Sequence, residues 1–150
     1  MMELIIKSGI YKPALFKALS FDYDGILADL TDQKVFDNMG LKAFHKFNKY
    51  MMNIPHNSGC LLNLFKALHD DKNIELHITT ARSILTSQRV ENSLKHHGID
   101  TRRIKIHYLN GNSKSEHLKT LAVQAHFDDI EKHVTTPVNG VAMVHVRGVW

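Results

Sequence analysis

The fold of this 150-residue chain is decided by one stretch, Leu19-Ser20-Phe21-Asp22-Tyr23-Asp24-Gly25-Ile26-Leu27-Ala28-Asp29. A short apolar run, which can be buried as a strand, ends here in two carboxylates, Asp22 and Asp24. Gly25 follows them and can take backbone conformations that are closed to other residues. Because ligands bind at the carboxyl ends of strands in an open parallel sheet, the stretch predicts a site at the end of a buried strand. Taken alone, it is equally typical of an ordinary acidic turn.

The composition is that of a single globular domain spanning residues 1–150. Hydrophobic residues make up 43% of the chain and charged residues 23%, and a chain of this length can bury one core. Cys60 is the single cysteine, so no intrachain disulfide can form and a reducing compartment is expected. No run of ~20 apolar residues is present, so we expect a cytoplasmic protein without a membrane partner.

The chain is moderately basic, with 19 Lys and Arg against 15 Asp and Glu, a net charge of +4 and a pI of about 9.2. This excess favours anionic partners, and a small phosphorylated molecule satisfies it as well as a nucleic acid does. No aromatic residues alternate with the basic residues near Arg102, so we expect a solvated face there and not a platform for stacked bases.

Strands and helices are expected to alternate along the chain, because short apolar runs alternate with segments of helical spacing. The strands are expected at residues 17–21, 74–80, 104–109, 125–129 and 141–146. The helices are expected at residues 31–50 with an interruption near Gly40, at 61–68, at 83–97 and at 113–122. Residues 1–16 are an N-terminal arm or an extra strand, and residues 30–60 or so hold at most a small helical cap.

This alternation predicts an α/β fold with a doubly wound parallel sheet, right-handed crossovers and helices on both faces. The pair Asn139-Gly140 allows one alternative, in which it turns a hairpin into the last strand.

The carboxyl ends of parallel strands meet at one edge of the sheet, which collects the polar residues that end these strands. Those residues are Asp22, Asp24, Thr80, Asp128 and Asp129. Lys114 joins them from the start of a helix, which Ser113 and Glu116 open as a capping box. Crowded carboxylates repel unless a cation lies between them, and an all-oxygen cluster with room for water and phosphate suits Mg²⁺.

This set of residues resembles the motifs of the haloacid dehalogenase superfamily. Asp22-Tyr23-Asp24-Gly25 fits its D-x-D-G first motif, Thr80 its Thr or Ser at a strand end, Lys114 its lysine, and Asp128-Asp129 its acidic fourth motif. The likeness covers residues 17–146 and implies a Rossmann-like sheet flanked by helices. The segments Asp-Gly-Ile-Leu-Ala-Asp, Thr-Ala-Arg and Phe-Asp-Asp look most like the small nucleotidase-like branch.

The resemblance implies a phosphatase that passes through an aspartyl-phosphate. Asp22 would attack phosphorus, while Asp24 would protonate the leaving oxygen and later deprotonate the attacking water. The side chains of Asp22 and Asp128 and the backbone carbonyl of Asp24 would bind Mg²⁺, which offsets the repulsion between carboxylate and phosphate. Thr80 and Lys114 would bind the phosphoryl oxygens.

Three further residues lie next to these motifs. Asp129 would orient Lys114 or a metal-bound water, with direct ligation of the metal left open. Arg82 would either meet the substrate or form a surface salt bridge, and His133 would line the pocket. Ile26 stands where the family often has Thr, which removes a hydroxyl but none of the proposed reacting groups.

The small cap leaves several functions open. An acid at Asp24 favours hydrolysis of a phosphate ester over dehalogenation. The substrate would be either a larger phosphorylated molecule or a small one enclosed by a second copy of the chain, so a nucleotide substrate and a homo-oligomer both fit. The alternatives are a non-catalytic module that binds phosphate or nucleic acid on the same fold, and a polynucleotide 3′-phosphatase.

Overall fold

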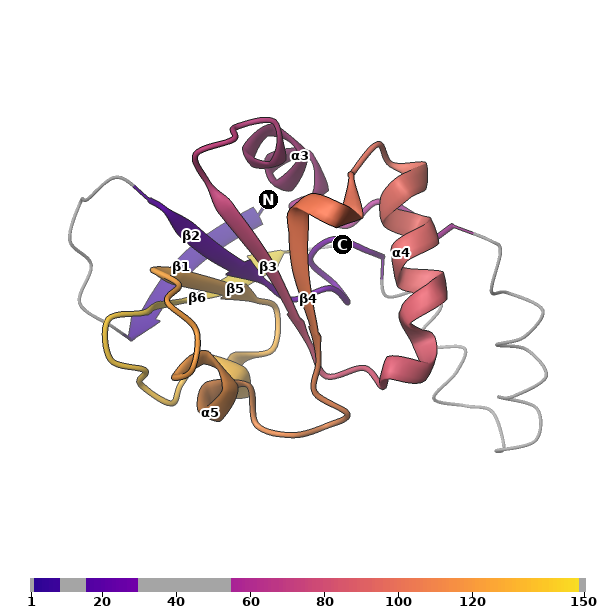
Figure 1. Ribbon diagram of the computed structural model, residues 1–150. Helices are drawn as coiled ribbons and strands as arrows, with labels where there is room; N and C mark the ends of the chain where they lie inside the picture. The colour runs from indigo at the N-terminus through magenta and orange to yellow at the C-terminus, as the bar shows by residue number, and fades with distance from the viewer. Residues whose placement is uncertain (1, 9–15, 30–54, 149–150) are drawn as a thin grey trace, which may run out of the picture.

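The computed structural model describes residues 2–8, 16–29 and 55–148 (Figure 1). The expected helix at residues 31–50 therefore lies outside the described residues, as does most of the expected cap at 30–60. Within the described ranges, no helix has the length and apolar character needed to cross a membrane.

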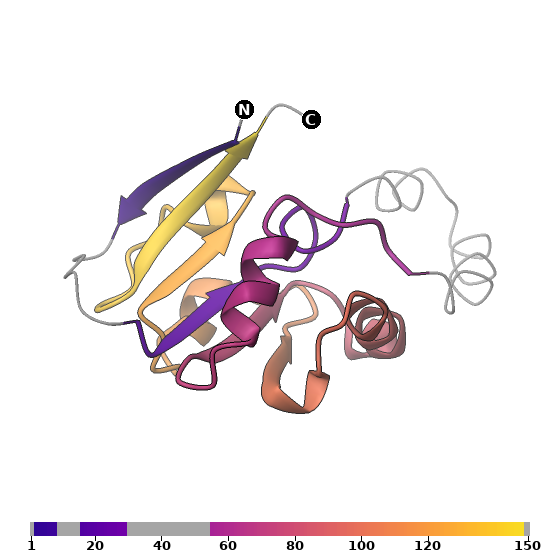
Figure 2. The same cartoon turned by 90° about the horizontal axis from the view of Figure 1, so that it is seen from above.

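A six-stranded sheet forms the centre of the fold, in the order β1-β6-β5-β2-β3-β4. Its strands are β1 (Met2–Ser8), β2 (Ala18–Phe21), β3 (Glu75–Thr80), β4 (Ile104–Tyr108), β5 (Ala125–Asp128) and β6 (Ala142–Gly148). Strands β2 to β6 are parallel to one another, and β1 runs antiparallel beside β6 at one edge (Figure 2). This arrangement confirms the predicted doubly wound α/β fold.

Strand pairing decides between the alternatives that the sequence left open for two segments. Residues 2–8 form an extra strand, because β1 adds to the free edge of β6. Asn139-Gly140 does not join two strands of the sheet as a hairpin, since β6 pairs with β5 in parallel. These two residues instead make a tight turn between Val138 and Val141, where Gly140 has a φ of +77°.

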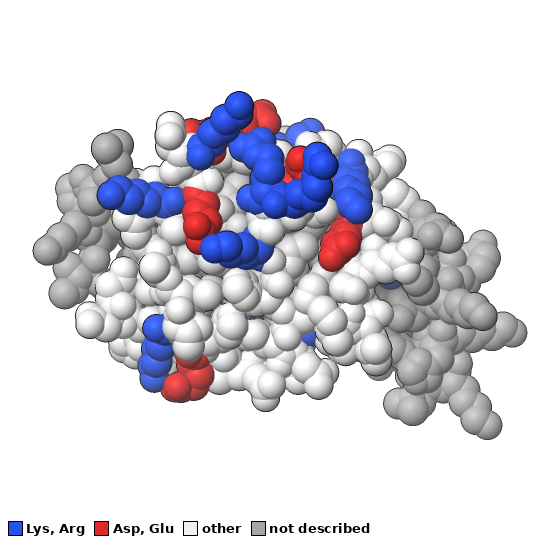
Figure 3. All heavy atoms as spheres, viewed as in Figure 1, with Lys and Arg blue, Asp and Glu red and all other residues white. Residues whose placement is uncertain are grey.

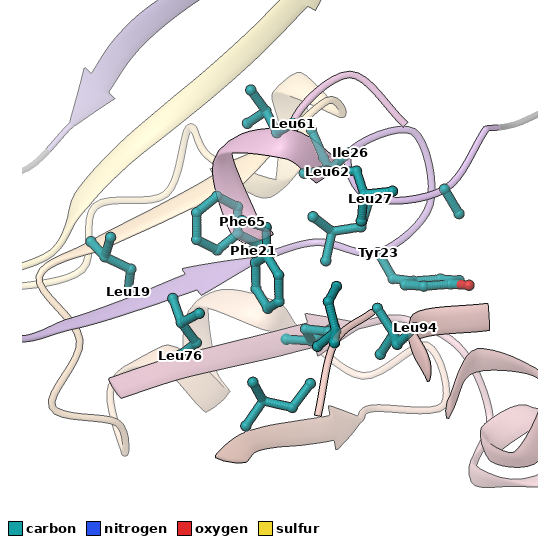
Figure 4. Close-up of a cluster of buried hydrophobic side chains, with 14 of the residues drawn as sticks. Leu19, Phe21, Tyr23, Ile26, Leu27, Leu61, Leu62, Phe65, Leu76 and Leu94 are labelled. Carbon is teal, nitrogen blue, oxygen red and sulfur yellow. The ribbon is translucent and has the colours of Figure 1, made fainter. Parts of the chain in front are cut away.

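The helices cover both faces of the sheet: α3 (Leu62–His69) and α4 (Ser87–His96) lie on one face, and α5 (Lys114–Leu118) on the other. Side chains alternate along a strand, so β2 sends Leu19 and Phe21 to the first face. There the ring of Phe21 meets Phe65 of α3 edge-on, with centroids 5.1 Å apart (Figure 4). The opposite face holds a smaller apolar cluster and a band of buried polar side chains.

Two helices are shorter than the spacing predicts. A 3-10 turn at Ile84–Thr86 precedes α4. In the expected helix at 83–97, the spacing predicts Leu85 on or near the same face as Val90 and Leu94, but Leu85 is 84% exposed. Helix α5 ends at Leu118, after which the chain continues in tighter i→i+3 hydrogen bonds. Ala122 is therefore exposed, whereas an α-helix continued to this residue would have turned it inward.

Candidate active site

The sheet order brings three strand ends together. Strand β2 lies between β3 and β5, so Asp22, which follows β2, has Thr80 at the end of one neighbour and Asp128 at the end of the other. The amide of Asp22 donates a hydrogen bond of 2.8 Å to the carbonyl of Phe127, which ties the β2 loop to β5. The register of the parallel strands thus places Asp22 and Asp128 side by side, as predicted.

Three carboxylates form a compact group at this edge. One oxygen from each of Asp22, Asp128 and Asp129 lies within 4.8 Å of the other two. Asp129 rests against the backbone of Gly25, where an added Cβ would lie 2.2 Å from its Oδ2 atom. Gly25 also has a φ of +79°, so both its backbone conformation and the neighbouring carboxylate require glycine.

Lys114 bridges two of these carboxylates. Its ammonium lies 2.7 Å from Asp22 Oδ1 and 2.5 Å from Asp128 Oδ2, and all three side chains are buried. Helix α5 delivers the lysine, because the Ser113 hydroxyl accepts a hydrogen bond from the amide of Glu116 and so caps the helix directly before its first residue, Lys114. The Ser113 half of the predicted capping box is therefore present, whereas the Glu116 carboxylate bonds to Lys119 at 2.7 Å.

Burial and mutual charge shift the pKa values of this group. Burial raises the pKa of Asp22 well above its usual value; Lys114 opposes this shift and Asp128 adds to it. Burial would also raise the pKa of Asp128, but hydrogen bonds from His126 and His133 and the charge of Lys114 bring it below its usual value. For Lys114, the two carboxylates outweigh the effect of burial and raise the pKa.

The residues can hold a divalent cation. Asp129 Oδ1 is buried and has no hydrogen-bond partner among the described residues. Burial and the charge of Asp128 raise the pKa of Asp129 to about 6. Three carboxylates face one ammonium, so the group combines excess negative charge with an unpartnered oxygen. Such an oxygen-only donor set is typical of sites for hard divalent cations.

Asp24 is not one of these three carboxylates, although its charge adds to the raised pKa of Asp22 and of Asp129. Its two oxygens accept hydrogen bonds from Arg82, at 2.8 Å from Nε and 2.7 Å from a terminal nitrogen. The guanidinium also lies over the ring of Tyr23, 5.4 Å from the centroid. Of the two expectations for Arg82, the structure therefore contains the ion pair, although that pair is mostly buried. Substrate contact by Arg82 stays a prediction, as does metal binding through the Asp24 carbonyl.

The other predicted residues lie around the carboxylates. Thr80 is buried, and its hydroxyl accepts a hydrogen bond of 3.2 Å from the amide of Arg82. His133 Nδ1 lies 3.2 Å from Asp128 Oδ2 and also lines a pocket of about 330 Å³. That pocket is lined by Ala81, Gly111, Asn112, Ser113, Lys114, Ser115, Lys132, His133 and Thr136. Asp129, expected to orient Lys114 or a metal-bound water, belongs to the carboxylate group, and its role stays a prediction.

Sequence analysis missed His126, whose Nε2 atom lies 3.3 Å from Asp128 Oδ2 in the buried interior. Its ring extends the site to Ser20, whose hydroxyl lies 2.9 Å from His126 Nδ1. A signal was present, because residues two apart on a strand share a face and His126 stands two before Asp128. Only the strand pairing, however, brings Ser20 to the same place.

The basic residues that suggested a nucleic-acid partner are largely paired. Lys and Arg side chains gather in the upper part of the face in Figure 3, with acidic side chains among them. Before β4, Arg102 pairs with Asp100 at 3.0 Å, and within β4, Lys105 pairs with Glu75 of β3 at 3.1 Å. Arg102 and Lys105 are both exposed, which fits the expectation of a solvated face.

Fold and site together define the class of this protein: a haloacid dehalogenase-like α/β protein, with carboxylates and a lysine at the carboxyl ends of its parallel strands. Comparison with family models is more specific. The model described as 5′-nucleotidase matches residues 17–149, and the chain belongs to the 5′-nucleotidase family. A search of curated proteins finds no match.

Proposed function

We propose that this protein is a Mg²⁺-dependent phosphatase that hydrolyses a nucleoside monophosphate through an aspartyl-phosphate on Asp22. Membership of the 5′-nucleotidase family implies a nucleotide-hydrolysing phosphatase. The observation that supports this chemistry best is the burial of Asp22 beside Lys114 within a group of three carboxylates. A carboxylate held in this way can act as a nucleophile toward an electrophilic phosphorus.

Each of these side chains has a separate role in phosphoryl transfer. Asp22 forms the new bond to phosphorus as the ester oxygen leaves, and water later releases the phosphate from Asp22. Lys114 and the Thr80 hydroxyl bind phosphoryl oxygens, where negative charge is spread during transfer. The carboxylates of Asp22, Asp128 and Asp129 hold Mg²⁺, which when bound offsets the repulsion between carboxylate and phosphate.

Asp24 serves as the general acid and then as the general base. Its ion pair with Arg82 restricts when it can act as the acid. A carboxylate that accepts two hydrogen bonds from a guanidinium has no proton to donate. The pair must open before Asp24 can protonate the leaving oxygen. An arriving phosphoryl group is anionic and offers Arg82 another partner, so substrate binding itself would free Asp24.

Two further aspects of the proposal rest on the sequence. The single cysteine favours a reducing, cytoplasmic location. A homo-oligomer that encloses the substrate remains compatible with a small cap. The paired basic surface lends no support to a nucleic-acid-binding module or a polynucleotide 3′-phosphatase, so we rank both below the nucleotidase.

Hydrolysis of a substrate panel tests the proposal. The panel holds 5′- and 3′-nucleoside monophosphates and a 3′-phosphorylated oligonucleotide, each assayed with Mg²⁺ and with EDTA. We expect phosphate release from the 5′-nucleotides in Mg²⁺ only, and its loss in Asp22→Asn with an unchanged far-UV circular dichroism spectrum. Asp70→Asn, at the exposed end of α3, is the matched control and should keep full activity. Unchanged turnover in Asp22→Asn would overturn the nucleophile, and preference for the oligonucleotide would favour the 3′-phosphatase.

A further inference from the structure

A row of buried polar side chains crosses three strands beneath the carboxylate group. Thr79 Oγ1 lies 2.8 Å from Ser20 Oγ, and Ser20 Oγ lies 2.9 Å from His126 Nδ1. His126 Nε2 then lies 3.3 Å from Asp128 Oδ2. All four residues have no exposed surface. The row therefore connects β3, β2 and β5 by side-chain hydrogen bonds that end on a carboxylate of the site.

The carboxylate of Asp128, at the end of the row, determines which atom donates and which accepts in each hydrogen bond. An ionised carboxylate can only accept, so His126 must carry its proton on Nε2 to bond to Asp128. In the neutral ring Nδ1 is then an acceptor, and the Ser20 hydroxyl donates to it. The Ser20 oxygen in turn accepts from the Thr79 hydroxyl. Each bond thus selects the tautomer or rotamer that the next one needs.

The row ends at Asp128 Oδ2, and both oxygens of this carboxylate have other hydrogen-bond donors. Asp128 Oδ2 also receives the ammonium of Lys114 at 2.5 Å, while Oδ1 accepts from the amide of Ile130 at 2.9 Å. With donors on both oxygens, the carboxylate plane cannot turn without breaking several hydrogen bonds. Its orientation toward Asp22 and Asp129 is therefore set by the surrounding protein.

The row is more polar than packing alone requires. The same face of the sheet holds a cluster of buried apolar side chains that includes Ala18, Leu118 and Met143. Burying hydroxyls and an imidazole costs free energy unless each finds a partner, so apolar residues would fill this space at lower cost. The partners are arranged in a line that ends on Asp128, which points to a role in holding that carboxylate.

We propose that Thr79, Ser20 and His126 form a positioning relay that orients Asp128 to bind the divalent cation. The inference rests on the proposed function, because that function supplies the cation. His126 is a positioning residue, since its hydrogen bond is to Asp128 and not to the proposed nucleophile. Partners of this kind behind a metal ligand typically contribute about 10- to 100-fold to metal affinity.

Two substitutions at one position separate positioning from packing. In His126→Gln the amide nitrogen can reach the place of Nε2 and still donate to Asp128. In His126→Asn the shorter amide reaches the place of Nδ1, which keeps a partner for Ser20 but loses Asp128. Ser20→Ala removes the donor that selects the tautomer. His69→Gln is the matched control, because His69 is also buried but bonds to the backbone of Asp100.

The main readout is cation binding, measured as loss of the free Mn²⁺ signal in electron paramagnetic resonance and by competition with Mg²⁺. We expect His126→Asn to weaken Mn²⁺ binding about 10-fold or more, Ser20→Ala to weaken it less, and His126→Gln and His69→Gln to stay near wild type. Urea unfolding in EDTA should show similar losses of stability in the Asn and Gln variants, because both lose the same ring.

The outcomes separate this inference from the proposed function. If the wild type binds Mn²⁺ and hydrolyses nucleotides but His126→Asn binds Mn²⁺ equally well, the relay is overturned and the function stands. If the wild type binds Mn²⁺ with this dependence on His126 but releases no phosphate from any nucleotide, the function is overturned and the relay stands. If the wild type binds no Mn²⁺, both are overturned.

Discussion

Replacing Lys114 by Met should destabilise the protein strongly, and Mg²⁺ should reverse much of the loss. Methionine keeps an unbranched side chain of similar length but removes the ammonium that contacts Asp22 and Asp128. Two buried carboxylates are then left without the cation that they contact. They must take up protons or remain as uncompensated charges, and both responses oppose folding.

The magnitude follows from the burial of the three groups. The side chains of Lys114, Asp22 and Asp128 are at most 6% exposed, so solvent screening weakens their interaction little. Removing one partner of such a buried pair costs about 3–5 kcal/mol. A domain with a free energy of unfolding of about 5–15 kcal/mol would lose a large part of its stability.

Mg²⁺ should act as a substitute cation in the variant. A ligand that binds only the folded state at about 100 times its dissociation constant adds about 2.7 kcal/mol. Because the variant lacks the competing ammonium, the cation should stabilise it more than it stabilises the wild type. The assay is urea unfolding followed by circular dichroism, in EDTA and in Mg²⁺, for both proteins.

The control is Lys119→Met, which removes an exposed lysine that pairs with Glu116 at the surface. Exposed pairs contribute about 0–1 kcal/mol, so this variant should unfold like the wild type. The reasoning would be refuted if Lys114→Met were as stable as the wild type in EDTA. It would also be refuted if Mg²⁺ shifted the urea midpoints of both proteins equally.

Two further predictions concern Gly25 and His107. Gly25→Ala should lower the free energy of unfolding by about 1–2 kcal/mol from the positive φ alone. It should also weaken Mn²⁺ binding, because the new Cβ displaces Asp129. A wild-type Mn²⁺ affinity in this variant would contradict a role for Asp129 as a ligand. Burial, with the charges of His117 and His77, lowers the pKa of His107 to about 4. Since the unfolded state has a pKa near ~6.5 and so binds more protons below that pH, stability should fall as the pH drops from about 6.5 to 4. His107→Gln should flatten that fall by about 1 kcal/mol once solvent screening is allowed for, and an unchanged pH profile of the urea midpoint would contradict this.

Much of the fold could be predicted because its signals are local. Each parallel strand is a short apolar run next to turn residues, and the alternation of strands with helices leaves few topologies. The end of α4 and the start of α5 were also readable, because Gly98 and the Ser113 cap act within one turn. Leu85 was misplaced because a 3-10 turn changes the angle between successive side chains, which helical periodicity does not reveal.

The order of residues along the chain was enough to predict which chemical groups follow the strands. Asp22, Thr80, Lys114 and Asp128 could be assigned to one edge of the sheet because parallel strands carry their carboxyl ends to the same side. The glycine after Asp24 could be assigned to a special backbone conformation, which the φ of Gly25 agrees with. These properties depend on the order of residues along the chain.

Which of these groups contact one another became clear only from the folded chain. It paired Asp24 with Arg82, 58 residues away, and placed Asp129 with the buried carboxylates. It also joined Ser20 to His126 across two strands whose pairing no local pattern specifies. The physical reason is that hydrogen bonds and ion pairs act over about 3 Å, whereas a sequence pattern locates a side chain only to a strand end or a face.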